Sequence, residues 1–210
     1  MTTLELPVSL GEALDKLTIL DIKLARITDG RKANVQIEYD LLYSKLEVYI
    51  SKYPLLYESL KKINNDIWDM MDDLRDGDIS DELYLKVCKK TIIYNDIRFR
   101  IKNKINILNQ SLIKEEKGYK VTKCAVNIDR YDHVAELINP IVTLSFKYDQ
   151  VIVHSDDESK LSVIQSELGY DPSILVSNAN SDMDCSPIVL NSQMTKHDLY
   201  VALDVVEFYE

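Results

Sequence analysis

The chain has 210 residues, of which 46% are hydrophobic, and a formal net charge of −10. That length exceeds the roughly 100 to 150 residues typical of one domain and predicts two domains. No apolar run in the sequence approaches the ~20 residues that are needed to cross a bilayer. The N-terminus lacks the basic and apolar regions of a signal peptide. We therefore expect a protein without a membrane span that stays in the cytoplasm.

The charge is divided unevenly along the chain. Residues 1–118 contain 19 Lys and Arg against 20 Asp and Glu, whereas residues 119–210 contain 6 against 15. This change in charge next to Gly118 predicts a boundary between two domains, 1–118 and 119–210. Because an acidic domain repels phosphates at long range, we expect no nucleic acid partner.

Apolar residues in the first part recur at steps of three and four, which is the spacing of amphipathic helices. The first helix is predicted to begin after Ser9, which fits an S-x-x-E capping box with Glu12. It is predicted to stop at Gly30. A second apolar stripe is predicted for the next helix, through Val35, Tyr39, Leu42, Leu46 and Tyr49.

Two further helices complete the first part. Pro54 suits the first turn of a new helix, and the glycine of the sequence RDGDIS predicts a turn at position 77. The last helix is predicted to exceed 30 residues and to end near Gly118, with Leu112 on its apolar stripe. Folding the two helices into a hairpin places Asp69 near Lys86, so opposite charges would face each other. The first part is thus predicted to be an all-α hairpin or bundle.

The second part changes to the pattern of a small α/β domain. Strands are predicted within 119–128, 150–155 and 173–177, and helices within 131–147, 156–169 and 195–210. Strands that alternate with helices predict βαβ crossovers and a mostly parallel sheet. The fold class is therefore predicted to be α+β multidomain, with a helical bundle followed by an α/β domain.

The polar residues of the first helix permit two interpretations. Glu12, Lys16 and Lys23 lie together on a helical wheel with Asp15 at one side, and Glu12 to Lys16 is a favourable i, i+4 pair. They form either a cap with an ion pair, or a polar groove. In the groove the lysines would bind a carboxylate or phosphate of a small anionic ligand, and the two acidic residues would accept hydroxyls of a sugar.

A basic cluster on the last helix leaves the same choice open. Arg98 and Lys102 share one face of that helix at i and i+4. This face either is solvated or binds a ligand that carries a phosphate.

Polar side chains follow the predicted strands, at the edge where ligands gather in parallel sheets. These candidate ligand-binding residues are Asp129, His154, Ser155, Asp156 and Asp157. His154 is the best single candidate for acid and base chemistry, because carboxylates follow it in the chain. A capped helix start explains the residues after His154 equally well.

Few sequence signatures of enzymes are present. Asp182 and Asp184 have the D-x-D spacing with which many metal-dependent glycosyltransferases hold a divalent cation and a nucleotide sugar, but a three-residue match is weak evidence. The chain has five glycines, which permit neither a P-loop nor a G-x-G-x-x-G fingerprint. No cofactor is therefore predicted, and a divalent cation is expected only for a glycosyltransferase. Whether the protein is an enzyme stays open.

Stretches within about residues 5–119 resemble an uncharacterised family of short helical bacterial proteins with a domain of unknown function. They read PVSLGEALDKLTILDIKLARITDGRKANV, INNDIWDMMDDLRD, YNDIRFRIKNKINIL and EEKGY. The resemblance implies an all-α hairpin or bundle and no established activity. It also implies an association with genes for surface polysaccharide assembly, including glycosyltransferases, which is not a mechanism. The polar members of its first stretch are Glu12, Asp15, Lys16, Thr18 and Lys23.

Two functions of different classes remain. The first is a non-catalytic binding or scaffold protein, in which the helical part joins partners and the α/β part binds a small ligand. The alternative is a glycosyltransferase-like enzyme that uses a nucleotide sugar. The last helix carries Ile92, Ile93, Phe99 and Ile107 outside its main apolar stripe. This extra apolar surface predicts a homodimer through the helical part.

Overall fold

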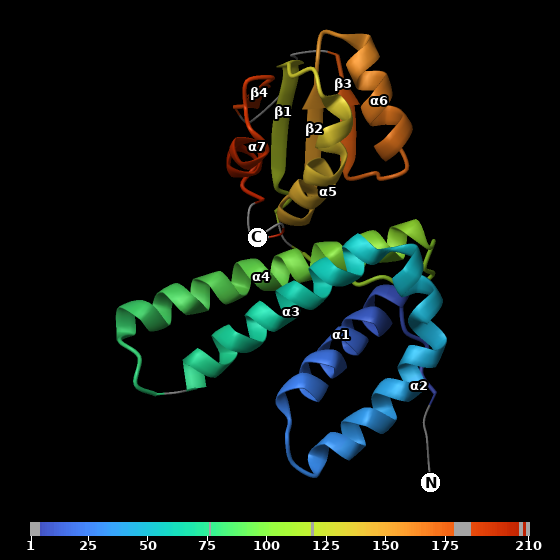
Figure 1. Ribbon diagram of the computed structural model, residues 1–210, viewed down its shortest axis with the longest axis vertical. Coiled ribbons are helices and arrows are strands. Elements are labelled where there is room, and N and C mark those ends of the chain that lie inside the picture. The colour runs from blue at the N-terminus through green and yellow to red at the C-terminus, as the bar shows by residue number, and fades with distance from the viewer. Residues whose placement is uncertain (1–4, 76, 119, 179–185, 206–207, 209–210) are drawn as a thin grey trace. The chain divides into compact units, whose positions relative to one another are not determined.

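The computed structural model describes residues 5–75, 77–118, 120–178, 186–205 and 208. Contacts within the chain divide it into two compact units, Met1–Glu116 and Lys117–Glu210. Helices make up the described part of the first unit, and a parallel sheet with helices makes up that of the second (Figure 1). The predicted α+β fold class is confirmed. No described helix is long and apolar enough to cross a membrane.

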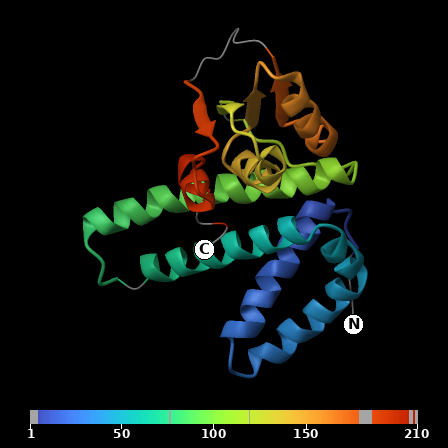
Figure 2. The same cartoon turned by 45° about the horizontal axis from the view of Figure 1, so that its top comes forward.

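The helical unit is built around its first helix. Its elements are α1 (Leu10–Arg26), α2 (Arg31–Lys52), α3 (Pro54–Arg75) and α4 (Asp81–Leu108). Helix α1 contacts the other three, and α3 lies alongside α4, as both views show (Figures 1 and 2). The fully buried core residues include Leu14, Leu17, Leu20, Leu60, Ile63, Ile97, Ile101 and Ile105. These positions follow the apolar periodicity of α1, α3 and α4.

Several helix ends are those that the sequence predicts. The Ser9 hydroxyl accepts a hydrogen bond from Glu12 N at 3.2 Å, and α3 begins at Pro54. Gly77 has a φ of 73° in the turn before α4, a conformation that favours glycine. The predicted extent of the last helix is wrong, because α4 has 28 residues and ends at Leu108. Leu112 lies beyond this end and is 99% exposed.

Helix α2 buries its predicted apolar stripe only in part. Of the five residues of that stripe, Leu46 is buried and the other four are half-buried. Three apolar side chains outside the stripe are exposed, those of Ile37, Leu41 and Val48. Helix α2 packs mainly against α1, so much of its surface is left uncovered within the unit.

The hairpin of α3 and α4 forms, but one predicted charge pair does not. The Asp69 carboxylate forms an ion pair with Arg26 of α1 and not with Lys86. Arg26 also donates a hydrogen bond of 2.7 Å to Asn65 and lies 5.7 Å from the Trp68 ring centroid. These contacts therefore join the acidic C-terminal part of α3 to the last turn of α1.

The α/β unit contains a parallel sheet with the strand order β3-β2-β1-β4. Its strands are β1 (Lys123–Arg130), β2 (Gln150–His154), β3 (Ile174–Ser177) and β4 (Ile188–Asn191), and its helices are η1 (Val134–Leu137), α5 (Ile138–Lys147), α6 (Glu158–Leu168) and α7 (Lys196–Ala202). The mostly parallel sheet is confirmed. Strand β4 was not predicted, although β3, which has the same length, was.

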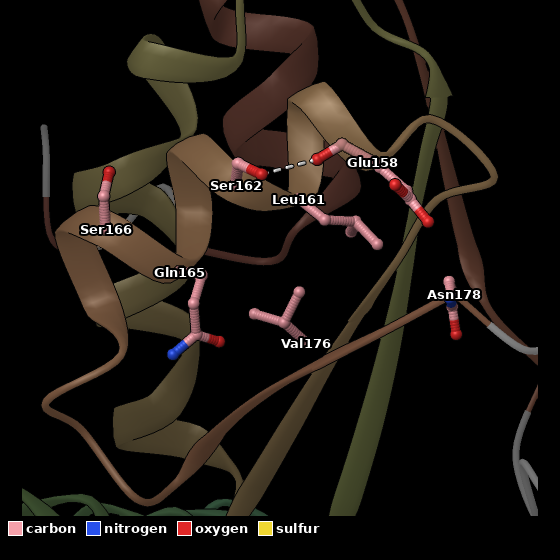
Figure 3. Close-up of a pocket in the computed structure, with 7 residues that line it drawn as sticks. All are labelled: Glu158, Leu161, Ser162, Gln165, Ser166, Val176 and Asn178. Carbon is pink, nitrogen blue, oxygen red and sulfur yellow. Dashed lines mark hydrogen bonds between the residues drawn. The ribbon is translucent and has the colours of Figure 1, made fainter.

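The register of the sheet places residues of β1, β2 and β3 side by side. Val126 pairs with Val153, which pairs with Val176, and the next level joins Asn127, His154 and the last residue of β3. The valine face contacts α6, as Figure 3 shows for Val176 beside Leu161. Side chains alternate between the two faces of a strand, so His154 lies on the opposite face of the sheet.

We expect residues 1–118 to remain helical when they are expressed alone. The apolar stripes of α1, α3 and α4 meet one another within this segment, and the helix ends have their own caps. Far-ultraviolet circular dichroism of the fragment measures this. A coil-like spectrum, or aggregation, would show that residues 119–210 complete the helical core.

Candidate functional site

The acidic residue Asp15 is the centre of a buried polar cluster in the helical unit. Its side chain is 4% exposed and accepts a bidentate interaction from the Arg98 guanidinium of α4, with Nε at 2.7 Å. Asn64 of α3 donates to Asp15 at 2.9 Å and to the Thr18 hydroxyl at 2.7 Å. The hydrogen bonds with Asp15 raise the pKa of Arg98. Arg98 is therefore engaged within the chain.

A second ion-pair cluster lies near the start of α1. Lys102 of α4 pairs with Glu12 and, at 2.9 Å, with Glu115. The backbone N–H of Gly11 donates to Asn106 Oδ1 at 2.7 Å. Because the carboxylate of Glu12 binds Lys102, the reciprocal half of the predicted capping box is replaced by a contact between helices. The two basic residues proposed to bind a phosphate, Arg98 and Lys102, are thus both neutralised by carboxylates.

The predicted row on α1 is divided between different surroundings. Lys16 forms an exposed ion pair with Glu38 of α2 at 2.6 Å and not with Glu12. Lys23 has no ion-pair partner among the described residues. Lys16, Glu12 and Asp15 do line one shared groove of about 720 Å³ between α1, α2 and residues 5–8. Apolar side chains form much of its lining, so it is not a purely polar groove.

The carboxyl edge of the sheet brings together several predicted residues of the α/β unit. Asp129, near the end of β1, accepts hydrogen bonds from Ser155 Oγ at 2.8 Å, from Asp156 N at 2.7 Å and from Asn127 Nδ2 at 2.8 Å. Burial opposes the charge of Asp129, but these hydrogen bonds outweigh it and lower the pKa of the carboxyl. Asp129 and Ser155 therefore fix the loop after β2.

Asp157 has a capping role in the same loop. It is the N-cap of α6 and accepts hydrogen bonds from Ser159 N at 2.9 Å and from Ser159 Oγ at 2.6 Å. These bonds lower the pKa of Asp157. The predicted capped helix start is present, and it accounts for Asp157 without catalysis.

A helix cap does not account for His154. Its side chain is fully buried at the end of β2, and Nδ1 lies 3.1 Å from the carbonyl oxygen of Ser177. The other ring nitrogen, Nε2, is buried and has no hydrogen-bond partner. The nearby Asp156 carboxylate, which is 78% exposed, lies 3.8 Å from Nε2, too far for a hydrogen bond. Buried polar atoms are nearly always paired, so this nitrogen marks the edge as a candidate ligand site.

Strand β4 adds a part of this edge that was not predicted from the sequence. The strand order reverses between β1 and β4, the position where ligands often bind in open parallel sheets. Ser192, after β4, donates to Asp132 Oδ2 at 2.9 Å, and Lys160 of α6 donates to Asp132 at 3.3 Å and to the carbonyl of Asp129 at 2.8 Å. The Ser192 contact joins the end of β4 to the loop after β1, and the Lys160 contacts join α6 to β1 and to that loop. The Ser192 contact could be recognised only once β4 was known to pair with β1.

Two cavities flank the carboxyl edge on the side of α6. One, of about 590 Å³, lies between α6 and the end of β3, and Figure 3 shows Gln165 and Asn178 on its wall. The other, of about 420 Å³, lies between η1 and α6 and is lined by Asp132 and Lys160. His154 lines neither cavity. The cavities offer room near the edge, while the unpaired nitrogen lies on the other face of the sheet.

The predicted cation site cannot be placed in this fold. Asp182 and Asp184 lie outside the described residues. Within the described ranges, no three His, Cys, Asp or Glu side chains gather to hold a metal ion.

A comparison with protein families places the chain in one of them. The chain is a two-unit α+β protein, and residues 4–139 match the family of unknown function DUF6165. The chain belongs to that family. The predicted membership of a family of unknown function is confirmed, and the match extends beyond the predicted 5–119 through β1 and η1 of the α/β unit. No curated protein and no solved structure matches the chain.

Proposed function

We propose that this protein is a non-catalytic binding or scaffold protein. The α/β unit binds a small polar ligand at the carboxyl edge of its sheet, and the helical unit is an interaction module. The observation that carries this proposal is the buried Nε2 of His154, which has no hydrogen-bond partner. An unpaired buried polar atom costs about 1–3 kcal/mol. A ligand that pairs with Nε2 would recover part of this free energy.

A nucleotide sugar is a less suitable ligand for this edge than an uncharged sugar. Asp129, Asp132, Asp156 and Asp157 all lie around this edge, and Lys160 already donates to Asp132 and to a backbone carbonyl. Such a rim repels a pyrophosphate in the absence of a cation. The alternative function, a glycosyltransferase-like enzyme, therefore has less support. A role in surface polysaccharide assembly rests on the family resemblance alone.

The proposed function is tested by calorimetric titration of the full chain with sugars and nucleotide sugars, with and without Mn²⁺. We expect saturable heat from at least one uncharged sugar without Mn²⁺, and its loss in His154→Asn. Asparagine can still donate to the Ser177 carbonyl but has no atom in place of Nε2, so the fold is kept. Binding that requires both a nucleotide sugar and Mn²⁺ would favour the enzyme instead.

The helical unit supports a homodimer through apolar side chains that its own helices leave uncovered. On α2 these are Ile37, Leu41 and Val48, which recur at helical spacing, and on α4 they include Ile92 and Ile93. Burying such a surface against a second copy removes it from water. Light scattering on the 1–118 fragment checks this, and a monomeric mass at high micromolar concentration would contradict it.

The cytoplasmic location stays a prediction.

A further inference from the structure

We infer that the ligand of the α/β unit presents two hydrogen-bond donors, which bridge His154 Nε2 and the Asp156 carboxylate. The inference rests on the proposed function, because it concerns the same edge of the sheet. It goes further by assigning the hydrogen-bonding character of the ligand. Two sources share this chemistry: neighbouring hydroxyls of an uncharged sugar, and an ammonium group.

The first step is the tautomer of His154. Nδ1 lies 3.1 Å from the backbone carbonyl oxygen of Ser177, and a carbonyl oxygen only accepts hydrogen bonds. Nδ1 therefore carries a proton, as the hydrogen-bond network assigns it. In the neutral ring Nε2 is then a bare lone pair, which can only accept. A protonated Nε2 would need an acceptor, and the Asp156 oxygen at 3.8 Å is too distant to serve.

The second step is the partner that faces this lone pair. Asp156 differs from the other carboxylates at the edge, because Asp129 accepts three hydrogen bonds and Asp157 caps α6. The side chain of Asp156 is 78% exposed, and it faces the imidazole of His154. An imidazole lone pair and a carboxylate are both acceptors. A group that satisfies both must therefore donate twice.

The same geometry argues against other ligands. A phosphate or carboxylate would bring a third set of acceptors against the first two, with no donor between them. A metal ion would accept both lone pairs, but the described residues supply no third His, Cys, Asp or Glu ligand. Because Nε2 is fully buried, a ligand reaches it only when neighbouring side chains move.

The inference is tested by imidazole ¹⁵N NMR of the full chain. The sequence contains three histidines, so His154→Asn assigns the signals of His154 by their loss. The free protein should show His154 protonated at Nδ1 and bare at Nε2. Titrations then use glucose and galactose as neutral sugars, glucosamine as the ammonium source, glucose 1-phosphate as the anion, and Zn²⁺ or Mn²⁺.

We expect a neutral hexose or glucosamine to shift Nε2 of His154 saturably. A response to both neutral hexoses identifies hydroxyls as the donors, and a response to glucosamine alone identifies the ammonium. Asp156→Asn should weaken this binding at least tenfold, because the amide can donate to Nε2 in place of the ligand. Asp156→Ala, at an exposed position, should weaken it because one of the two acceptors is removed. Circular dichroism of both variants controls for folding.

Other outcomes overturn the inference in distinguishable ways. A shift with glucose 1-phosphate but not with glucose, or with a metal ion alone, would leave a ligand site at His154 and refute the two-donor ligand. Tighter sugar binding by Asp156→Asn would refute it as well. No shift of His154 with any of these probes would refute both the inference and the proposed function.

Discussion

Replacing Arg98 by leucine is expected to lower the free energy of unfolding by about 3 to 5 kcal/mol, the range for removing one partner of a buried ion pair. Asp15 is 4% exposed and Arg98 is 25% exposed, so the leucine leaves a carboxylate inside the protein with only Asn64 as a side-chain donor. Urea denaturation followed by circular dichroism at 222 nm measures the change. The loss should be confined to the helical transition if the two units unfold separately.

Lys16→Ala is the matched control, because it also removes one cation from an ion pair that involves α1. The Lys16 and Glu38 side chains are 59% and 46% exposed, and exposed pairs contribute only about 0.2–1 kcal/mol. A double-mutant cycle between Asp15→Ala and Arg98→Leu measures the coupling of the buried pair. A loss of less than 1 kcal/mol in Arg98→Leu would show that water reaches Asp15 and that the cluster is open to ligands.

Gly11→Ala is expected to destabilise the helical unit by about 1–3 kcal/mol, the cost of forcing atoms into a packed contact. A Cβ at this position would lie 2.4 Å from the backbone oxygen of Lys102 and 2.9 Å from Asn106 Oδ1. Backbone cannot yield as a flexible side chain can, so α1 would have to move away from α4. The shift would also strain the hydrogen bond between Gly11 N and Asn106.

Gly30→Ala provides the comparison for this variant. No atom lies within 4 Å of a Cβ built on Gly30, whose backbone already has helical φ and ψ. Its effect should stay within about 0.5 kcal/mol, because the lost N-cap preference and the gain in chain stiffness oppose each other. Thermal melts of both variants measure the contrast. Equal melting temperatures would mean that α1 and α4 do not approach as closely as the structure shows.

The sequence by itself determined the elements whose signals are local. Ser9, Pro54 and Gly77 act within a few residues of their own position, through a side-chain cap, a missing N–H and a positive φ, so their roles could be predicted. Apolar periodicity likewise predicted α1, α3 and their buried stripes. The polar residues after β1 and β2 were predicted to share an edge, because parallel strands end on the same side.

Tertiary structure decided which partner each polar side chain meets. Asp15 and Arg98 are 83 residues apart, and periodicity gives no information on which of several cations a buried carboxylate will contact. The exposed face of α2 and the pairing of Asp69 with Arg26 depend in the same way on how helices pack. Strand β4 was recognised only from its pairing with β1.

His154 shows both contributions at one residue. Its place after a buried apolar run put it at the carboxyl edge from sequence alone. Its tautomer and its unpaired Nε2 follow from the Ser177 carbonyl on the neighbouring strand and from the position of Asp156. Hydrogen bonds depend on distances of a few tenths of an ångström between segments that are remote in the chain, so only the folded arrangement specifies them.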